Sequence, residues 1–163
     1  MTYSIFIDQE YFFRETGVDR NIDANIINHW IRKAQFVKIY SILGKDLYNK
    51  IDADINSSSL AGNYLILTNQ YVAPVLANWA KYFLGVNQNY SITNKGVQEK
   101  RSEFSNPIDL NKQWDTNKEL ELGVRDLEAA LLNYLDCNQE LFPEYVPQCG
   151  RYDSPYTDMF GLY

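Results

Sequence analysis

The 163-residue sequence is poor in the residue types that most often carry catalysis and metal binding. It contains one histidine, two cysteines and two methionines. A single histidine cannot build a His-rich metal site, and a cysteine nucleophile could use only His29 as its base. The sequence also has no Gly-Lys-Ser/Thr phosphate loop. We therefore expect no catalytic site, no metal and no cofactor.

One acidic stretch, Asp52–Asn56, resembles the first half of a calcium-binding loop. Such a loop requires glycine at its sixth position and a bidentate glutamate at its twelfth. Ser57 and Asn63 occupy those two positions. The stretch therefore predicts an acidic loop at the end of a helix.

Long hydrophobic runs and an excess of positive charge are also missing. The most apolar stretch, Tyr64–Leu84, is interrupted by polar residues and by Pro74 and Lys81, which excludes a membrane span. The 15 basic and 21 acidic residues give a net charge of -6. This negative net charge argues against binding of nucleic acid over the whole protein surface. It also argues against adsorption to an anionic membrane.

The N-terminus does not have the pattern of a secretion signal. It lacks a basic segment, and Asp8 and Glu10 interrupt its apolar residues. A reducing compartment is therefore expected, and Cys137 and Cys149 are predicted to be free thiols. Pairing between these two cysteines stays open.

Aromatic residues are abundant, with 13 tyrosines, 8 phenylalanines and 3 tryptophans. Apolar residues recur at helical spacing in three long segments. The first begins near capping residues Asn21–Asp23 and ends before Gly44, the second covers about residues 62–84, and the third runs from Asp109 to about Asn138. Pro74 predicts a kink or two abutting helices. The sequence therefore predicts an all-α fold with one long C-terminal helix.

Shorter elements complete this prediction. Residues 3–15 form a short helix or an extended lead-in, Lys45–Ile51 adds one or two helical turns, and Asp52–Leu60 is a loop. The tryptophans at positions 30, 79 and 114 fall on the apolar sides of their helices. Phe36, Ile39 and Leu43 widen the apolar side of the first helix, which predicts contacts with more than one neighbour.

Two segments differ from the helical body, which we place at residues 1–142. Residues 86–107 are polar, and Asn94–Gly96 is a turn signal, so this segment predicts a projecting loop or hairpin. Residues 143–163 are too rich in proline and glycine for a helix. Aromatic residues nevertheless recur from Phe142 to Tyr163, which predicts an extended arm that docks on a neighbouring protein.

Charge is unevenly distributed along the chain. Residues 61–114 carry five basic and three acidic residues, whereas residues 115–163 carry three basic and ten acidic residues. Complementary regions of this kind suit head-to-tail association of identical subunits. Solvated surfaces would give the same pattern.

Several short motifs resemble a family of tailed-bacteriophage head–tail connector proteins, also called adaptor or ring proteins, as in crAss-like and other phages of Bacteroidetes. The similarity begins with Asn21–Gln35 and Ile42–Tyr48 (ILGKDLY). It continues through Tyr71–Leu84, the turn at residues 93–97, the sequence at residues 103–105 and the long helix to Tyr134. It covers about residues 5–145.

The resemblance implies a structural virion protein without catalytic activity. Twelve copies would form a ring between the portal protein and a neighbouring tail or adaptor ring protein, at the head–tail junction, after assembly in the host cytoplasm. The ring would extend the channel through which genomic DNA passes without specific binding. A different helical morphogenesis or scaffold protein is the alternative. The residues expected at subunit or partner interfaces are Lys95, Gly96, Lys100, Arg101, Phe104, Tyr152, Tyr156, Phe160 and Tyr163.

Overall fold

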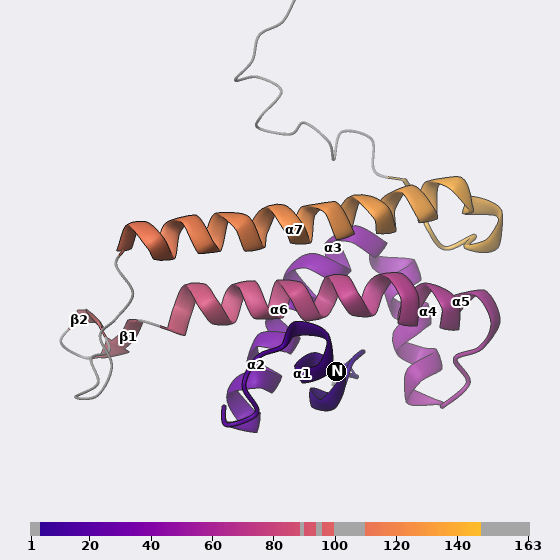
Figure 1. Ribbon diagram of the computed structural model, residues 1–163. Helices are drawn as coiled ribbons and strands as arrows, with labels where there is room; N and C mark the ends of the chain where they lie inside the picture. The colour runs from indigo at the N-terminus through magenta and orange to yellow at the C-terminus, as the bar shows by residue number, and fades with distance from the viewer. Residues whose placement is uncertain (1–3, 89, 94–95, 100–109, 148–163) are drawn as a thin grey trace, which may run out of the picture.

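A computed structural model (Figure 1) describes residues 4–88, 90–93, 96–99 and 110–147, which are mainly helical. The predicted all-α fold, with its long C-terminal helix, is confirmed. The α-helices are α1 (Gln9–Thr16), α2 (Ala24–Ala34), α3 (Tyr40–Leu43), α4 (Lys45–Asn56), α5 (Gly62–Ile66), α6 (Ala73–Gln88) and α7 (Leu110–Cys137). Two π-helical turns, η1 (Gln35–Ile39) and η2 (Leu67–Val72), one 3₁₀ turn, η3 (Gln139–Leu141), and strands β1 (Tyr90–Thr93) and β2 (Gly96–Glu99) complete the described elements.

α2, η1 and α3 form one uninterrupted helix over residues 24–43. Asp23 caps its start, because its carboxylate accepts a hydrogen bond of 2.7 Å from the backbone N–H of Asn25. Gly44 ends it with a φ of 77°, a left-handed conformation that side chains disfavour. Both ends agree with the sequence-based prediction.

The turn η1 changes which side of this helix is buried. Ile27, Ile31 and Ala34 are buried at ordinary helical spacing, and a regular α-helix would place residue 38 inside next. The π-helical turn accommodates one additional residue, so Ile39 is buried and Lys38 is only half-buried. The turn therefore keeps a lysine out of the core.

Gln35, at the start of η1, is buried and fully hydrogen-bonded. Its Oε1 accepts from the backbone N–H of Phe6 at 2.9 Å, and its Nε2 donates to the Ser4 carbonyl and to the Tyr48 hydroxyl, each at 2.8 Å. These bonds offset the cost of burying an amide. They also hold residues 4–7 against the first long helix.

Pro74 lies inside the second long helix, which is continuous through α5, η2 and α6. The π-helical turn η2 ends immediately before the proline, and the N–H of Ala73 bonds to the carbonyl of Thr68, five residues back. Proline has no N–H to donate and crowds the preceding turn. The wider turn accommodates it, so the helix continues instead of dividing into two.

α4 is longer than the sequence predicts, and the predicted loop at Asp52–Leu60 begins too early. The helix continues to Asn56, where the Asn56 amide donates to the Asp52 carbonyl at 2.9 Å. Lys50 and Asp54, four residues apart on one face, form an ion pair of 2.8 Å. The acidic stretch is therefore the last part of a helix.

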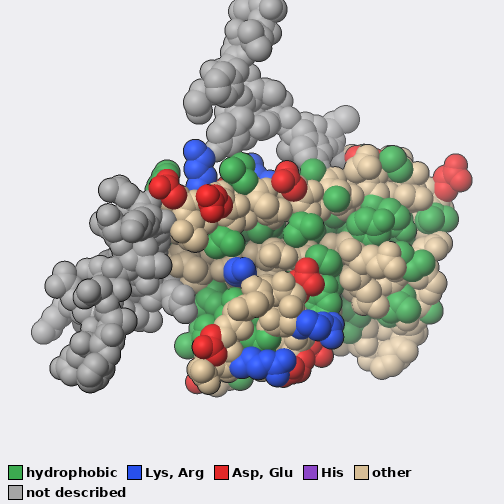
Figure 2. Space-filling model, in the orientation of Figure 1, with side chains coloured by type: hydrophobic (Ala, Val, Ile, Leu, Met, Phe, Trp, Pro, Cys, Tyr) green, Lys and Arg blue, Asp and Glu red, His purple; other side chains and the backbone are tan. Residues whose placement is uncertain are grey.

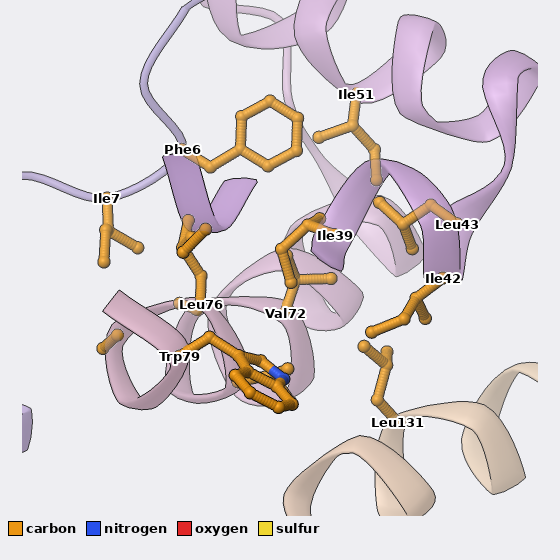
Figure 3. Packing of buried hydrophobic residues seen from close by; sticks show 14 of the residues in the cluster. Phe6, Ile7, Ile39, Ile42, Leu43, Ile51, Val72, Leu76, Trp79 and Leu131 are labelled. Carbon is orange, nitrogen blue, oxygen red and sulfur yellow. The ribbon is translucent and has the colours of Figure 1, made fainter. Parts of the chain in front are cut away.

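α6 lies at the centre of the fold. α1, α2 and α7 each pack against it, and Figure 1 shows α7 along one side of α6 and the N-terminal helices on the other. The core includes Leu76 of α6, Ile42 of α3 and Leu131 of α7. Figure 3 shows Ile42 and Leu131 pointing toward one another, which ties the long C-terminal helix to the N-terminal half.

The three tryptophans have different environments, although the sequence places all of them on apolar sides. Trp79 is 2% exposed and belongs to the core. Trp30 is half-buried, with the ring of His29 edge-on at 4.9 Å and Lys33 Nζ 4.9 Å from its centroid. Trp114 is 73% exposed. The prediction of an apolar, core-facing position is therefore wrong for Trp114.

The helical body extends beyond the predicted boundary at residue 142. Phe142 is fully buried, and its ring lies 5.5 Å from that of Tyr64. Tyr145 is 7% exposed and donates to Asp136 at 3.1 Å, while Tyr64 donates to Glu144 at 2.7 Å. The assignment of residues 143–147 to a partner-binding arm is therefore wrong. The rest of the predicted arm, from residue 148, lies outside the described residues.

Candidate interaction surfaces

The hairpin predicted for residues 86–107 is present in its central part. β1 and β2 are antiparallel, with Tyr90 opposite Glu99 and Thr93 opposite Gly96. α6 extends to Gln88, so the polar segment starts three residues later than predicted. Figure 1 shows the hairpin beyond the C-terminal end of α6, at one extremity of the helical body.

Gly96 is the only predicted interface residue that the described part of the chain contains, and it lies at the turn end of β2. The other predicted interface residues lie outside the described residues. These are Lys95, Lys100, Arg101, Phe104, Tyr152, Tyr156, Phe160 and Tyr163. The interface roles of all nine residues stay predictions.

Trp114 belongs to the hairpin end of the molecule. It lies in the first half of α7, one turn before Asn117. The Oδ1 atom of Asn117 is 3.7 Å from the position that a Cβ atom would have at Gly85, near the end of α6. This close approach places the beginning of α7 beside the end of α6. An indole that is 73% exposed next to a projecting hairpin is a candidate interface anchor. The sequence does not reveal it, because its spacing is that of a core residue.

A second surface lies on the outward side of α2 and η1, and we call it the basic face. Its apolar members Ile26, Phe36 and Val37 are 47%, 60% and 48% exposed. Arg32 and Lys33 are also exposed. The prediction that the helix over residues 24–43 contacts more than one neighbour is confirmed, since α1 and α6 both pack against it. Phe36 itself is exposed, and its ring stacks on Tyr40 with centroids 5.7 Å apart. Ile39 and Leu43, by contrast, are buried as expected.

The polar contacts between α6 and α7 hold the helices together. Trp79 donates from Nε1 to Glu128 at 3.2 Å, and Lys38 Nζ lies 3.7 Å from the centroid of the same indole. Tyr82 donates to Glu121 at 3.4 Å. Burial, followed by the charge of Glu121, raises the pKa of Tyr82 above its ordinary value. Tyr82 therefore stays neutral as a hydrogen-bond donor at neutral pH.

The pKa of Tyr64 is strongly raised. Burial and its hydrogen bond to Glu144 raise its pKa to about 12. Such a shift makes the phenol a weaker acid, which suits a structural hydrogen bond. It ties α5 to the segment after α7.

Neither cavity described in the structure has the features of an active site. One, of about 410 Å³, is lined in part by Asp8 and Glu10. Asp8 caps α1 through the N–H of Tyr11, and Glu10 forms an ion pair of 2.9 Å with Arg20. The other, of about 440 Å³, is an open depression formed by consecutive residues 136–141.

The described residues contain no group of three or more His, Cys, Asp or Glu side chains that could hold a metal ion. His29 is exposed beside Trp30. Cys137 is an exposed free thiol, whereas Cys149 lies outside the described residues. None of the helices in the described part of the chain is both long and apolar enough to cross a membrane.

The fold and these surfaces define an all-α protein with a projecting hairpin and exposed apolar side chains on more than one helix. The chain belongs to the group described as "Family of unknown function (DUF6712)", which matches residues 39–154. The matched region begins in η1 and includes α4 to α7 and the hairpin. No curated protein and no solved structure matches the chain.

Proposed function

We propose that this protein is a structural subunit of a homo-oligomeric ring at the head–tail junction of a tailed bacteriophage. The ring lies between the portal and the tail, extends the DNA channel and provides a platform for tail attachment. The sequence resemblance at residues 21–35 and 42–48 supplies the identity of the assembly.

The observation that carries the proposal is the exposure of large apolar side chains at separate places on a small helical body. Trp114 beside the hairpin is 73% exposed, and Phe36 on the basic face is 60% exposed. Single exposed apolar residues are common on monomers. Large exposed aromatic side chains, however, are typical anchors of surfaces that become buried on assembly. Two such surfaces allow each subunit to contact two neighbours.

The charge of the chain suits a channel through which DNA slides. Affinity for DNA depends mainly on lysine and arginine contacts with phosphates. The chain has a net charge of -6, and α7 carries three basic and six acidic residues. A ring of such subunits would bind DNA weakly, which is compatible with passage of a genome.

The proposal is tested with the purified full-length chain, alone and mixed with the portal protein encoded by the same genome. We expect rings in electron micrographs and a sedimentation coefficient far above that of a 19.0 kDa monomer. Trp114→Ser should reduce ring formation without lowering the melting temperature. A native chain that stays monomeric and does not bind the portal contradicts the proposal and favours a helical morphogenesis or scaffold protein.

The predicted arm has its own test. A chain that ends at Pro147 retains Phe142 and Tyr145, the buried aromatic residues after α7. We expect it to fold and melt like the full chain but to assemble poorly. Normal assembly of this shortened chain contradicts a role of the arm in the ring.

A further inference from the structure

The helix over residues 24–43 has charges of only one sign. It contains Arg32, Lys33 and Lys38 and no acidic residue. Arg32 and Lys33 are exposed on the basic face, and Lys38 is half-buried against the indole of Trp79. Arg32 makes no hydrogen bond or ion pair within the described residues. The basic face therefore combines an available positive charge with the exposed ring of Phe36.

α7 carries the opposite charge on the side that points away from α6. A line of residues spaced three or four apart follows its outer surface, and we call it the acidic stripe. Its members, all exposed, are Asp115, Glu119, Leu122, Asp126, Ala129, Asn133 and Cys137. The stripe has three carboxylates, and Leu122, near its middle, is 48% exposed. Two exposed basic residues of α7, Lys118 and Arg125, lie beside the stripe, and Arg125 pairs with Glu121 at 2.7 Å. Figure 2 shows acidic side chains along the upper part of the body, where α7 lies in Figure 1.

The basic face and the acidic stripe cannot meet within one molecule. α2 and α7 both pack against α6, and each turns its exposed side away from that helix. Their lengths nevertheless correspond. At a rise of 1.5 Å per residue, residues 24–43 span about 30 Å and residues 115–137 about 35 Å. Two helices of matched length, opposite charge and exposed apolar centres are complementary surfaces for packing between molecules.

We propose that the basic face of one copy docks on the acidic stripe of the next copy. This inference rests on the proposed ring function and names the contact between the helical bodies of adjacent copies, which does not include Trp114. Arg32 would face Glu119 and Asp126, and Phe36 would pack beside Leu122. Lys33 lies at the edge of the contact, because its Nζ is 5.5 Å from the ring centroid of Phe83 in α6. Because the two surfaces differ, the contact is heterologous, and its repetition gives a ring or an open chain instead of a closed dimer.

A second copy fits the basic face better than nucleic acid does. The face offers two exposed cations next to three exposed apolar side chains, whereas DNA binding requires many phosphate contacts. The acidic stripe supplies both carboxylates and an apolar partner on a helix of matching length. Exposed ion pairs contribute little affinity. We therefore assign the affinity to the apolar contact between Phe36 and Leu122, and the orientation of the two copies to the charged side chains around it.

The test uses two full-length double variants. Arg32→Ser/Phe36→Ser removes the basic face, and Glu119→Lys/Asp126→Lys removes the acidic stripe. Each variant keeps the other surface intact. We expect each one alone to be monomeric, and a 1:1 mixture to form a heterodimer that grows no further, because each molecule has only one working surface. Sedimentation velocity distinguishes monomer, dimer and ring.

Glu15→Lys/Glu140→Lys is the matched control. It changes the net charge by the same amount as the acidic-stripe variant but alters exposed residues of α1 and η3. We expect this control to assemble like the native chain, and all variants to keep the native melting temperature and circular dichroism. Loss of assembly in the control overturns the inference, since net charge would then explain the effect.

The failure of this inference differs from the failure of the proposed function. If the native chain forms rings and both face variants also form rings, the docking contact is wrong and the ring function stands. If only one face variant loses assembly, or if the mixture does not form heterodimers, the pairing of these two surfaces is also wrong. A native chain that remains monomeric at every concentration and does not bind the portal overturns both.

Discussion

Replacing Phe142 with alanine should strongly destabilise the isolated subunit. The ring is fully buried, and the rings of Tyr64 and Tyr134 lie 5.5 Å and 6.0 Å from it. Removing a buried phenylalanine costs about 3–5 kcal/mol, through lost burial and the cavity that remains. For a domain of this size, that loss lowers the melting temperature by about 10 °C.

The adjacent Leu141 provides a control for this substitution, because it is 40% exposed and lies in the same short turn. Leu141→Ala should cost less than about 1 kcal/mol. Urea denaturation followed by circular dichroism measures both variants. At an m value of about 2 kcal/mol/M, Phe142→Ala lowers the midpoint by roughly 2 M. Equal midpoints for the two variants would refute the assignment of Phe142 to the core.

Three further predictions follow from other contacts. Trp79→Ala should lower the free energy of unfolding by about 3–5 kcal/mol, measured by urea denaturation, because the indole is 2% exposed. Gln35→Leu leaves the N–H of Phe6 without its acceptor, so it should cost roughly 1–3 kcal/mol and speed amide exchange at Phe6, and unchanged exchange argues against the bond. The raised pKa of Tyr64, about 12 when folded against 10.0, means that its stabilising effect is complete below pH 10 and is lost as pH rises toward 12. Ultraviolet titration should show late tyrosine ionisation in the native chain, and Tyr64→Phe should reduce its amplitude by one tyrosine.

The two ends of the first long helix were the part of the fold that sequence patterns predicted best. Asp23 caps the helix with its side chain, and Gly44 ends it through its backbone conformation. Both effects are local, so they can be predicted without knowing the tertiary structure. The hairpin turn is local for the same reason. The longer extent of α4 was not predicted, because the acidic and polar composition of Asp52–Asn56 indicated a loop. Its ion pair and side-chain bond to the backbone depend on helical spacing.

Features that depend on neighbouring elements could not be predicted in the same way. Trp114 and Trp79 have similar spacing in the sequence, but only Trp79 lies beside other helices on the inner side of the fold. Phe142 and Tyr145 follow the last long helix and precede proline-rich residues. Nothing local shows whether such aromatics pack on their own subunit or on a partner. The predicted interface residues other than Gly96 lie outside the described residues, so the structure does not test them.

The π-helical turn η1 also affects how the chain can tolerate insertions and deletions. A regular helix rotates by about 100° for each residue that is added or removed, which would turn every later side chain away from its neighbour. Within residues 35–39 the helix already contains one additional residue. A related chain that lacks Lys38 would form an ordinary α-helix there, with Ile31 and Ile42 still facing the core. The chain can therefore lose one residue at this turn while retaining the same packing surfaces.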